Sequence, residues 1–277
     1  MSSPNPRKRL RVKTHGAALF AAAAGRAIAR SMPRILTYNV HRCVGMDGEL
    51  DVARTAKAIA QMRPDIVALQ ELDVLRARTD RVDQAHAIAE LLGMSFHFHP
   101  AFRVEEESYG DAILTSWPIR VMRAGALPGS NAVRGLEPRG ALWVKIDLGE
   151  VELDVVNTHL GLVPHEQRAQ AAALVSDVWM GHPDCTDPAI LLGDFNATPR
   201  HAAYRRLAGR LRDAQKVHRR HGLRTFPSRF PMIRIDHVFV SRSVTVTGVH
   251  AGHGALVRLA SDHLPLAVDF RIDLRAK

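Results

Sequence analysis

Cysteines and long apolar runs are both scarce in this chain of 277 residues. Only two cysteines occur, Cys43 and Cys185, which excludes a disulfide framework and a four-cysteine zinc site. Such sparse cysteine usage fits a reducing compartment, so we expect a cytoplasmic protein, with peripheral membrane contact left open. No apolar run approaches the roughly 20 residues that a membrane-spanning helix requires.

Acidic residues are absent from the first 34 positions, although the whole chain contains 28 of them. The same stretch holds eight of the 38 Lys and Arg residues, so most of the net charge of +10 lies there. The remainder of the chain has a net charge of only +2. The overall charge therefore does not by itself favour a nucleic-acid partner.

The N-terminal stretch and the body differ enough to predict a boundary at residue 34. Residues 1–33 form a basic extension, helical or disordered, in which 14–30 is rich in alanine and has Thr14 as a potential N-cap. Three interpretations remain open. In the first, the extension is a frayed appendage, or it arises from an upstream start and the true start is Met32. In the others it is a basic amphipathic helix on anionic lipid, or a targeting segment.

The body, residues 34–277, has the composition of one globular domain. The chain is 46% hydrophobic and 24% charged, which excludes a disordered protein. No repeat or low-complexity linker divides it. Apolar periodicity predicts strands over 34–40, 66–72, 95–99, 111–116, 141–148, 151–159, 189–194, 235–241, 244–250 and 264–272, and helices over 51–62, 81–92, 166–180 and 202–208. This order indicates two packed sheets with helices outside.

Polar residues recur within or next to six apolar strands, at positions that a core would exclude. An unpaired buried carboxylate costs several kcal/mol or takes up a proton. A single residue of this kind could be explained as a core group that is paired with a partner. The recurrence of such residues in six strands instead favours their convergence at one edge of a sheet. The residues concerned are Asn39, Glu71, Asn157, His159, Asp194, Asn196, Asp236, Asp262 and His263.

The chemistry of this set points to phosphoester hydrolysis. Carboxylate and amide oxygens without thiolates suit Mg²⁺, Mn²⁺ or Ca²⁺, whereas zinc would require more His or Cys. Asn side chains can orient a nucleophile or donate to a phosphoryl oxygen. A His beside an Asp can be held as an imidazolium that stabilises developing negative charge. Together these groups predict metal-assisted hydrolysis.

Six motifs in order make the chain resemble the endonuclease/exonuclease/phosphatase superfamily. They are TYNVH, ALQELD, NTHLG, GDFNATP, RIDHVFVS and SDHLPL, spread over residues 34–270. The superfamily includes pancreatic-type deoxyribonuclease, exonuclease III-like abasic-site endonucleases, neutral sphingomyelinases, inositol-polyphosphate 5-phosphatases and deadenylases. The resemblance implies an α+β fold, a four-layer α/β/β/α sandwich of two packed mixed sheets with outer helices. It also implies an active site at one end of the sheets and identifies 34–277 as the catalytic domain.

The resemblance assigns a metal site. Glu71 matches the principal metal ligand, Asn39 a residue that supports metal and phosphate, and Asp262 a carboxylate near the metal. The expected cofactor is Mg²⁺, with Mn²⁺ or Ca²⁺ as substitutes.

It also assigns the reacting groups. Asp194 matches the carboxylate that orients or deprotonates the attacking water, and Asn196 its phosphate-binding companion. Asp236 and His263 match a hydrogen-bonded pair in which the Asp fixes the imidazole. The expected reaction is in-line attack of water on phosphorus, without a covalent enzyme intermediate.

Four further positions complete the candidate set. His159 matches a His placed on the scissile phosphate or leaving group. Asn157 lies two residues earlier, hence on the same strand face, and we expect it to contact the phosphate. Arg139 opens a strand and is either a phosphate clamp or a surface residue. Asp111 either lines the cleft or caps its strand, and we favour the cap.

Two features bear on the substrate. Position 41 is His where abasic endonucleases usually carry Asp, which argues against their substrate. Residues 200–234 are basic and form either a stripe beside the site or a solvated face; the residues are Arg205, Arg206, Arg210, Arg212, Lys216, Arg219, Arg220, Arg224, Arg229 and Arg234.

We therefore predict a Mg²⁺-dependent phosphodiesterase that acts as a monomer on a nucleic acid or a phospholipid. The alternatives are a DNA endonuclease or exonuclease, and a phospholipid phosphodiesterase with peripheral membrane contact through 1–33. A non-catalytic nucleic-acid-binding module is disfavoured, because every catalytic-type position holds a competent residue.

Overall fold

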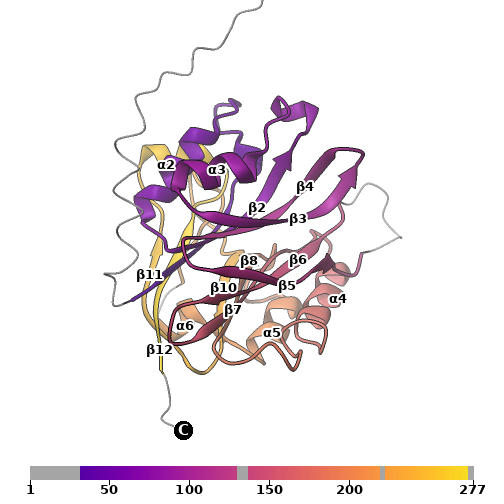
Figure 1. Ribbon diagram of the computed structural model, residues 1–277, viewed down its shortest axis with the longest axis vertical. Helices are drawn as coiled ribbons and strands as arrows, with labels where there is room; N and C mark the ends of the chain where they lie inside the picture. The colour runs from indigo at the N-terminus through magenta and orange to yellow at the C-terminus, as the bar shows by residue number, and fades with distance from the viewer. Residues whose placement is uncertain (1–31, 130–136, 219–221, 274–277) are drawn as a thin grey trace, which may run out of the picture.

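Four layers make up the protein in a computed structural model that describes residues 32–129, 137–218 and 222–273. Figure 1 shows them from top to bottom as helices, sheet, sheet and helices. The α/β/β/α sandwich expected from the sequence is confirmed. The basic extension, up to position 31, lies outside the described residues. Within the described ranges no helix is both long and apolar enough to cross a bilayer.

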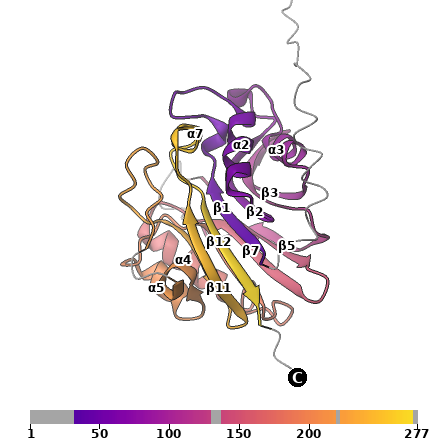
Figure 2. The same cartoon turned by 90° about the vertical axis from the view of Figure 1, so that its left-hand side faces the viewer.

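The first sheet has six strands in the order β11-β12-β1-β2-β4-β3. Their bounds are Val244–Ala251, Leu266–Ile272, Arg34–Asn39, Ile66–Val74, Glu107–Thr115 and Ser95–Val104. β1 and β2 are parallel, whereas the other neighbours are antiparallel. Figure 2 shows β11, β12 and β1 side by side.

The second sheet also has six strands, in the order β5-β6-β7-β8-β10-β9. Their bounds are Ile119–Ala126, Gly140–Asp147, Glu152–His159, Ala189–Asp194, Asp236–Val240 and Arg212–Asp213. β7 and β8 form its parallel pair, with His159 beside Asp194. The parallel pair of each sheet therefore carries candidate residues at its carboxyl end.

Alternating side chains explain the layers, because successive residues of a strand face opposite sides of the sheet. Ile35 belongs to the core between the sheets, whereas Leu36 packs toward the outer helices. Val155 and Val156 alternate in the same way in the second sheet. The central strands are apolar on both faces because both faces are covered.

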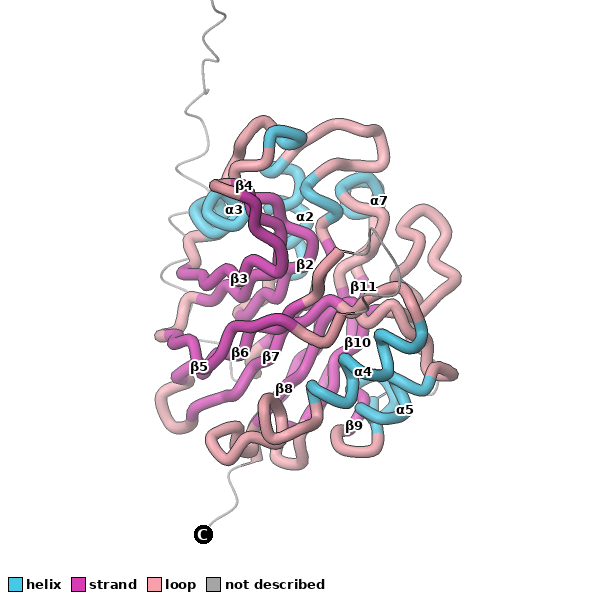
Figure 3. Tube along the Cα trace, turned by 90° about the vertical axis from the view of Figure 1, so that its right-hand side faces the viewer, coloured by secondary structure: helices cyan, strands magenta, loops and turns pink. Residues whose placement is uncertain are grey.

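Helices cover the outer face of each sheet. α2 (Val52–Met62) and α3 (Gln84–Leu92) pack on the first sheet. α4 (Pro164–Leu174) and α5 (Ala202–Ala208) pack on the second, as Figure 3 also shows. The shorter elements are α6 (Ala214–His218), α7 (Ala255–Ala260), η1 (His41–Cys43) and η2 (Ala77–Thr79).

Several segments differ from the sequence prediction. The short elements α6, α7 and β9 were not expected. β5 was not expected, because this edge strand is largely exposed and lacks a clear apolar face. The helix expected over 166–180 begins at Pro164 and ends at Leu174, followed by turns through Gly181. The other predicted elements are present, with bounds shifted by a few residues.

Candidate active site

The carboxyl ends of β1 and β8 meet where the two sheets come together. Asn39 ends β1 and Asp194 ends β8. The Asn39 Nδ2 atom donates to Asp194 Oδ2 over 3.1 Å and to Glu71 Oε1 over 3.0 Å. The amide oxygen of Asn39 accepts from the His41 backbone N–H at 3.0 Å, which fixes the orientation of the side chain. The Asn39 amide therefore holds the carboxylates of Glu71 and Asp194, which come from different sheets, in position.

Glu71 reaches the site through a local break in β2. The pairing of β2 with β4 shifts register between Leu69 and Leu72, and Glu71 has a φ of 62°. A non-glycine residue in the left-handed region inside a strand carries a cost of about 1 to 3 kcal/mol. The bulge leaves the Glu71 side chain 21% exposed, so its carboxylate faces the cavity rather than the core.

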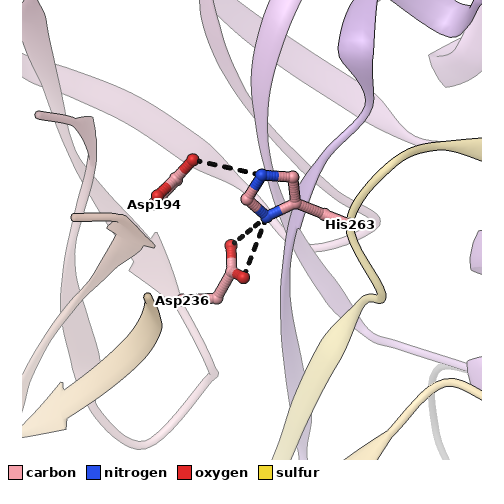
Figure 4. A group of neighbouring side chains, drawn as sticks. All are labelled: Asp194, Asp236 and His263. Atoms are coloured by element: carbon pink, nitrogen blue, oxygen red, sulfur yellow. Dashed lines mark hydrogen bonds and ion pairs between the residues drawn. The ribbon is translucent and has the colours of Figure 1, made fainter. Parts of the chain in front are cut away.

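His263 lies between two carboxylates, as Figure 4 shows. Its Nδ1 is 3.0 Å from Asp236 Oδ2 and its Nε2 is 3.6 Å from Asp194 Oδ2. Burial alone would lower the pKa of His263, but the Asp236 and Asp194 carboxylates outweigh burial and raise it above its ordinary value. Burial raises the pKa of Asp194, although the imidazolium of His263 opposes this effect. The expected Asp236–His263 pair is present.

His159 projects from the end of β7 beside Asn196. Arg139 Nη1 lies 3.2 Å from His159 Nδ1, and a guanidinium can only donate. The Nε2 atom lies 3.5 Å from Asp194 Oδ2 and 3.1 Å from Asn196 Nδ2, which is also a donor. A neutral ring therefore accepts from Arg139 or from Asn196, but not from both. Burial, followed by repulsion from Arg139 and His263, lowers the pKa of His159, so the ring stays neutral.

A cavity of about 450 Å³ opens at this junction. Seven of the eleven candidate residues line it, whereas Asn39 and Asp236 lie behind them as hydrogen-bond partners. The cavity is also lined by residues outside the set predicted from the sequence. The full lining is His41, Arg42, Glu71, Tyr109, Glu137, Arg139, His159, Leu162, Asp194, Asn196, Phe226, Ile235, Asp262 and His263.

Asn157 does not fit the phosphate contact expected for it. Its side chain is fully buried between the sheets, where Nδ2 donates to the carbonyl oxygens of Leu69 and Ala112, both over 2.9 Å. Its Oδ1 accepts from Gln70 Nε2 at 2.7 Å. Three protein partners satisfy the amide, so Asn157 joins the second sheet to the first.

Arg139 lines the cavity and is not a surface residue. Its side chain is only 8% exposed, and it interacts with the Tyr109 hydroxyl and lies 3.4 Å from Glu137 Oε2. Its Nε is buried without a hydrogen-bond partner among the described residues.

Asp111, for which a strand cap was favoured, is 3% exposed, and burial raises its pKa to about 8. Its charged surroundings, Arg139 and Glu71, belong to the site.

Arg42 was not selected for the site, although it directly follows the TYNVH motif. His41, Arg42 and Cys43 have φ values of 46°, 57° and 56°, so three consecutive L-residues are left-handed. This turn directs His41 and Arg42 to the cavity, and Arg42 Nη2 lies 2.7 Å from His41 Nε2. Conformational strain of this kind cannot be inferred from residue types alone.

The donor set fits a divalent metal that prefers oxygen ligands. Glu71 and Asp262 both line the cavity, and Asn39 holds the Glu71 carboxylate in place. Asp194, Asp236 and His263 also offer ligand atoms within 4.8 Å of one another. A metal there would have to replace the hydrogen bonds between His263 and Asp236. We therefore favour the cavity side, at Glu71 and Asp262.

The basic segment 200–234 is largely exposed in its described part. Arg212 donates to the carbonyl oxygens of three residues near β11, and Arg234 pairs with Asp213. Arg219 and Arg220 lie outside the described residues. Arg205, Arg206, Arg210, Lys216, Arg224 and Arg229 are exposed.

Residues 36–263 match the Endonuclease/Exonuclease/phosphatase family. The chain belongs to this family. Its members are metal-dependent hydrolases that act on phosphoester bonds, and the protein is therefore a phosphoester hydrolase. The resemblance drawn from the six motifs is confirmed over most of the body.

Individual proteins are similar to this chain in sequence or in fold. The chain is 26% identical over 251 residues to the uncharacterized protein YbhP of Escherichia coli strain K12, covering 86% of this chain and 96% of YbhP. An endonuclease/exonuclease/phosphatase protein from Beutenbergia cavernae has a similar structure, with a TM-score of 0.71, 24% identity and coverage of 88% and 72%. A mannosyl-6-phosphatase from Bacteroides thetaiotaomicron has a TM-score of 0.67, 21% identity and coverage of 87% and 100%.

Proposed function

We propose that the protein hydrolyses phosphodiesters with Mg²⁺ by in-line attack of water. The observation that carries the proposal is the connected set of side chains around Asp194 Oδ2. Asn39 Nδ2 lies 3.1 Å from this atom, His159 Nε2 3.5 Å and His263 Nε2 3.6 Å. A carboxylate held by three groups at the end of a cavity is in position to orient a water molecule.

Each neighbour has a separate task in this proposal. The raised pKa of Asp194 lets its carboxylate accept a proton from water near neutral pH. Asp236 keeps His263 as an imidazolium, which stabilises the negative charge that develops on the phosphoryl oxygens. In the tautomer that accepts from Arg139 at Nδ1, neutral His159 donates from Nε2 to the phosphate, and the Asn196 amide nitrogen beside it is a second donor to the phosphate.

Glu71 and Asp262 would hold the cation, with Asn39 keeping the Glu71 carboxylate in position. When bound, Mg²⁺ supplies Lewis-acid polarisation of a phosphoryl oxygen. Mn²⁺ or Ca²⁺ are possible substitutes, because they accept the same oxygen ligands.

The substitution Asp194→Asn tests this proposal. It keeps the size of the side chain but removes the carboxylate that orients water, and we expect at least a ~10³-fold lower kcat on bis-p-nitrophenyl phosphate. The thermal midpoint should remain close to that of the wild type. Asp187→Asn is a control, because that carboxylate binds Ser241 and Ser243 outside the cavity. Wild-type turnover by D194N would contradict the mechanism.

A phosphomonoester is the second candidate substrate, favoured by the two guanidinium groups that line the cavity. Arg42 and Arg139 both have a buried Nε without a hydrogen-bond partner among the described residues. A terminal phosphate carries up to two negative charges, and two guanidinium groups can neutralise them. The solved relative named as a mannosyl-6-phosphatase is consistent with this alternative.

The ratio of kcat/KM for bis-p-nitrophenyl phosphate and p-nitrophenyl phosphate distinguishes the two candidates. Phosphodiesterase function predicts a clear preference for the diester with Mg²⁺ present. If the monoester is preferred, and Arg42→Gln removes that preference, the second candidate is correct.

A further inference from the structure

Residues 226–235, called here the apolar loop, expose large hydrophobic side chains to solvent. Phe230 is 76% exposed and Met232 is 66% exposed, with Ile233 exposed beside them. Scattered single hydrophobic residues on a surface need no explanation, but adjacent ones on one loop mark an interaction site.

The apolar loop is built to hold this tip outward. The Ser228 backbone N–H donates to the Asp262 carbonyl oxygen over 2.6 Å, and Ser228 Oγ donates to the Arg258 carbonyl oxygen over 3.0 Å. The Met232 N–H donates to the Phe226 carbonyl oxygen at 2.9 Å. The stem is therefore tied to α7 and to the segment that carries His263. In Figure 2 the loop projects beside α7.

The apolar loop also lies at the mouth of the active site. Phe226 and Ile235, its first and last residues, both line the cavity, so the exposed tip is only a few residues from the opening. Leu162, which lines the cavity from the connection between β7 and α4, is itself 67% exposed. Apolar side chains therefore border the opening at more than one point.

Basic residues predominate in the sequence around the apolar loop. Asp236 is the only acidic residue between positions 214 and 261, and its side chain is buried against His263. Arg224, Arg229 and Arg258 are exposed. Arg224 and Arg229 belong to or flank the loop, and Arg258 lies on α7, to which the loop is tied. Arg229 donates to the Met46 carbonyl oxygen, beside exposed Asp47, which pairs with Arg54, and Glu49. The surface combines an apolar tip with exposed Arg residues on the loop and on α7.

We infer that the apolar loop docks on an anionic lipid surface and turns the cavity toward it. Phe and Met side chains gain free energy when they enter the boundary between headgroups and acyl chains, and the surrounding Arg residues pair with anionic headgroups. A nucleic acid would match the Arg residues but would leave Phe230 and Met232 against a charged backbone. This docking is separate from the proposed hydrolysis, because it needs no metal and no reacting group.

Vesicle co-sedimentation of the full-length chain tests the docking, with EDTA present so that lipid is not consumed. The probes are vesicles of phosphatidylcholine with one quarter phosphatidylglycerol, and vesicles of phosphatidylcholine alone. We expect the wild type to bind the anionic vesicles. The double variant Phe230→Ser with Met232→Ser should bind them at least ~10-fold more weakly, because two large apolar side chains are lost. Arg224→Gln with Arg229→Gln should reduce binding in low salt.

The matched control is Val121→Ser with Val178→Ser. Both valines are exposed, but one lies on β5 and the other beyond α4, and neither lines the cavity. The control should bind like the wild type. The basic extension is common to all variants, so its own affinity for lipid does not affect the comparison. If the Phe230/Met232 variant binds vesicles as well as the control does, the inference is wrong.

A second measurement tests whether the apolar loop binds DNA or a second copy of the chain instead of lipid. Phe230→Trp should show a blue-shifted emission with anionic vesicles and no shift with duplex DNA or with increasing protein concentration. A shift with DNA or on self-association, without one on vesicles, would assign the surface to that partner instead. Hydrolysis of a soluble diester by the Phe230/Met232 variant should match the wild type. Loss of docking and failure of the proposed catalysis are thus distinguishable.

Discussion

Asn39 and Asp194 lie 155 positions apart in the sequence, yet Asn39 Nδ2 donates to Asp194 Oδ2 over 3.1 Å. The contact joins the carboxyl end of β1 in one sheet to that of β8 in the other. The same amide nitrogen holds Glu71 Oε1 at 3.0 Å. The carboxylate expected to bind metal and the one expected to orient water are therefore positioned by a single side chain.

The substitution Asn39→Ala should lower kcat/KM about 100-fold, as the loss of a partner that orients an active-site ligand typically does. Both carboxylates lose a donor and repel each other without it. Steady-state kinetics on a soluble diester measures the effect. Thr37→Val is the control, since Thr37 lies on the same strand and bonds Gln70 in the core. Equal activity of N39A and wild type would exclude a positioning role for Asn39.

Glu71 is expected to dominate metal affinity. The variant Glu71→Gln keeps the shape of the side chain but removes its charge, and we expect at least ~10-fold weaker Mn²⁺ binding by titration calorimetry. EDTA should abolish wild-type activity, and Mg²⁺ or Mn²⁺ should restore it. Glu137→Gln is a control in the same cavity, because Glu137 pairs with Arg139. Unchanged Mn²⁺ affinity in E71Q would place the metal elsewhere.

Asn157 should matter for stability rather than for the phosphate. Replacement by Leu removes the side-chain donor to the carbonyl oxygens of Leu69 and Ala112 and one of the acceptors of the Gln70 amide, which keeps Thr37 and Ala68. The expected loss is about 3 kcal/mol in the free energy of unfolding. Urea denaturation measures this loss, and Mn²⁺ affinity should be retained in the folded fraction. A stable N157L protein that has lost turnover would restore the original expectation of a phosphate contact.

His237 should make the protein sensitive to acid. Burial, followed by repulsion from Arg234, lowers its pKa from 6.5 to about 4, so the ring stays neutral in the folded state where the unfolded chain already takes up a proton. Its contribution to stability is complete above about pH 6.5 and is lost as the pH falls toward 4.

Urea denaturation across this pH range tests the prediction. His237→Gln can still donate to the Ala197 carbonyl oxygen that His237 Nε2 contacts, but it cannot titrate. The free energy of unfolding should fall less steeply with acid in H237Q than in the wild type. Parallel pH profiles would show that His237 does not cause the sensitivity.

The sequence predicted much of this site because strand ends are visible as a pattern. Apolar runs that end in Asn39 or Asp194 indicate both the strand and the edge where its polar residue lies. Glu71 was predicted by the same logic, although its left-handed φ of 62° was not. That conformation depends on the bulge between β2 and β4, which requires the partner strand.

Residues selected by distant packing could not be predicted in this way. Tyr109 lines the cavity because its strand, β4, lies beside β2 in the first sheet. Glu137 lines it because the segment before β6 lies beside β7 in the second sheet. Arg139 remained undecided for the same reason. Its burial depends on His159 and Tyr109, and neither contact is local in sequence.

Asn157 and His159 show most clearly what the sequence determines and what the tertiary structure determines. The sequence alone determined that they share one face of β7, since side chains two residues apart in a strand point the same way. Only the tertiary structure decided that Asn157 lies where the sheets are closely packed and His159 where they part to form the cavity. Periodicity sets the face of a strand, but the depth along that face depends on the packing of the opposite sheet.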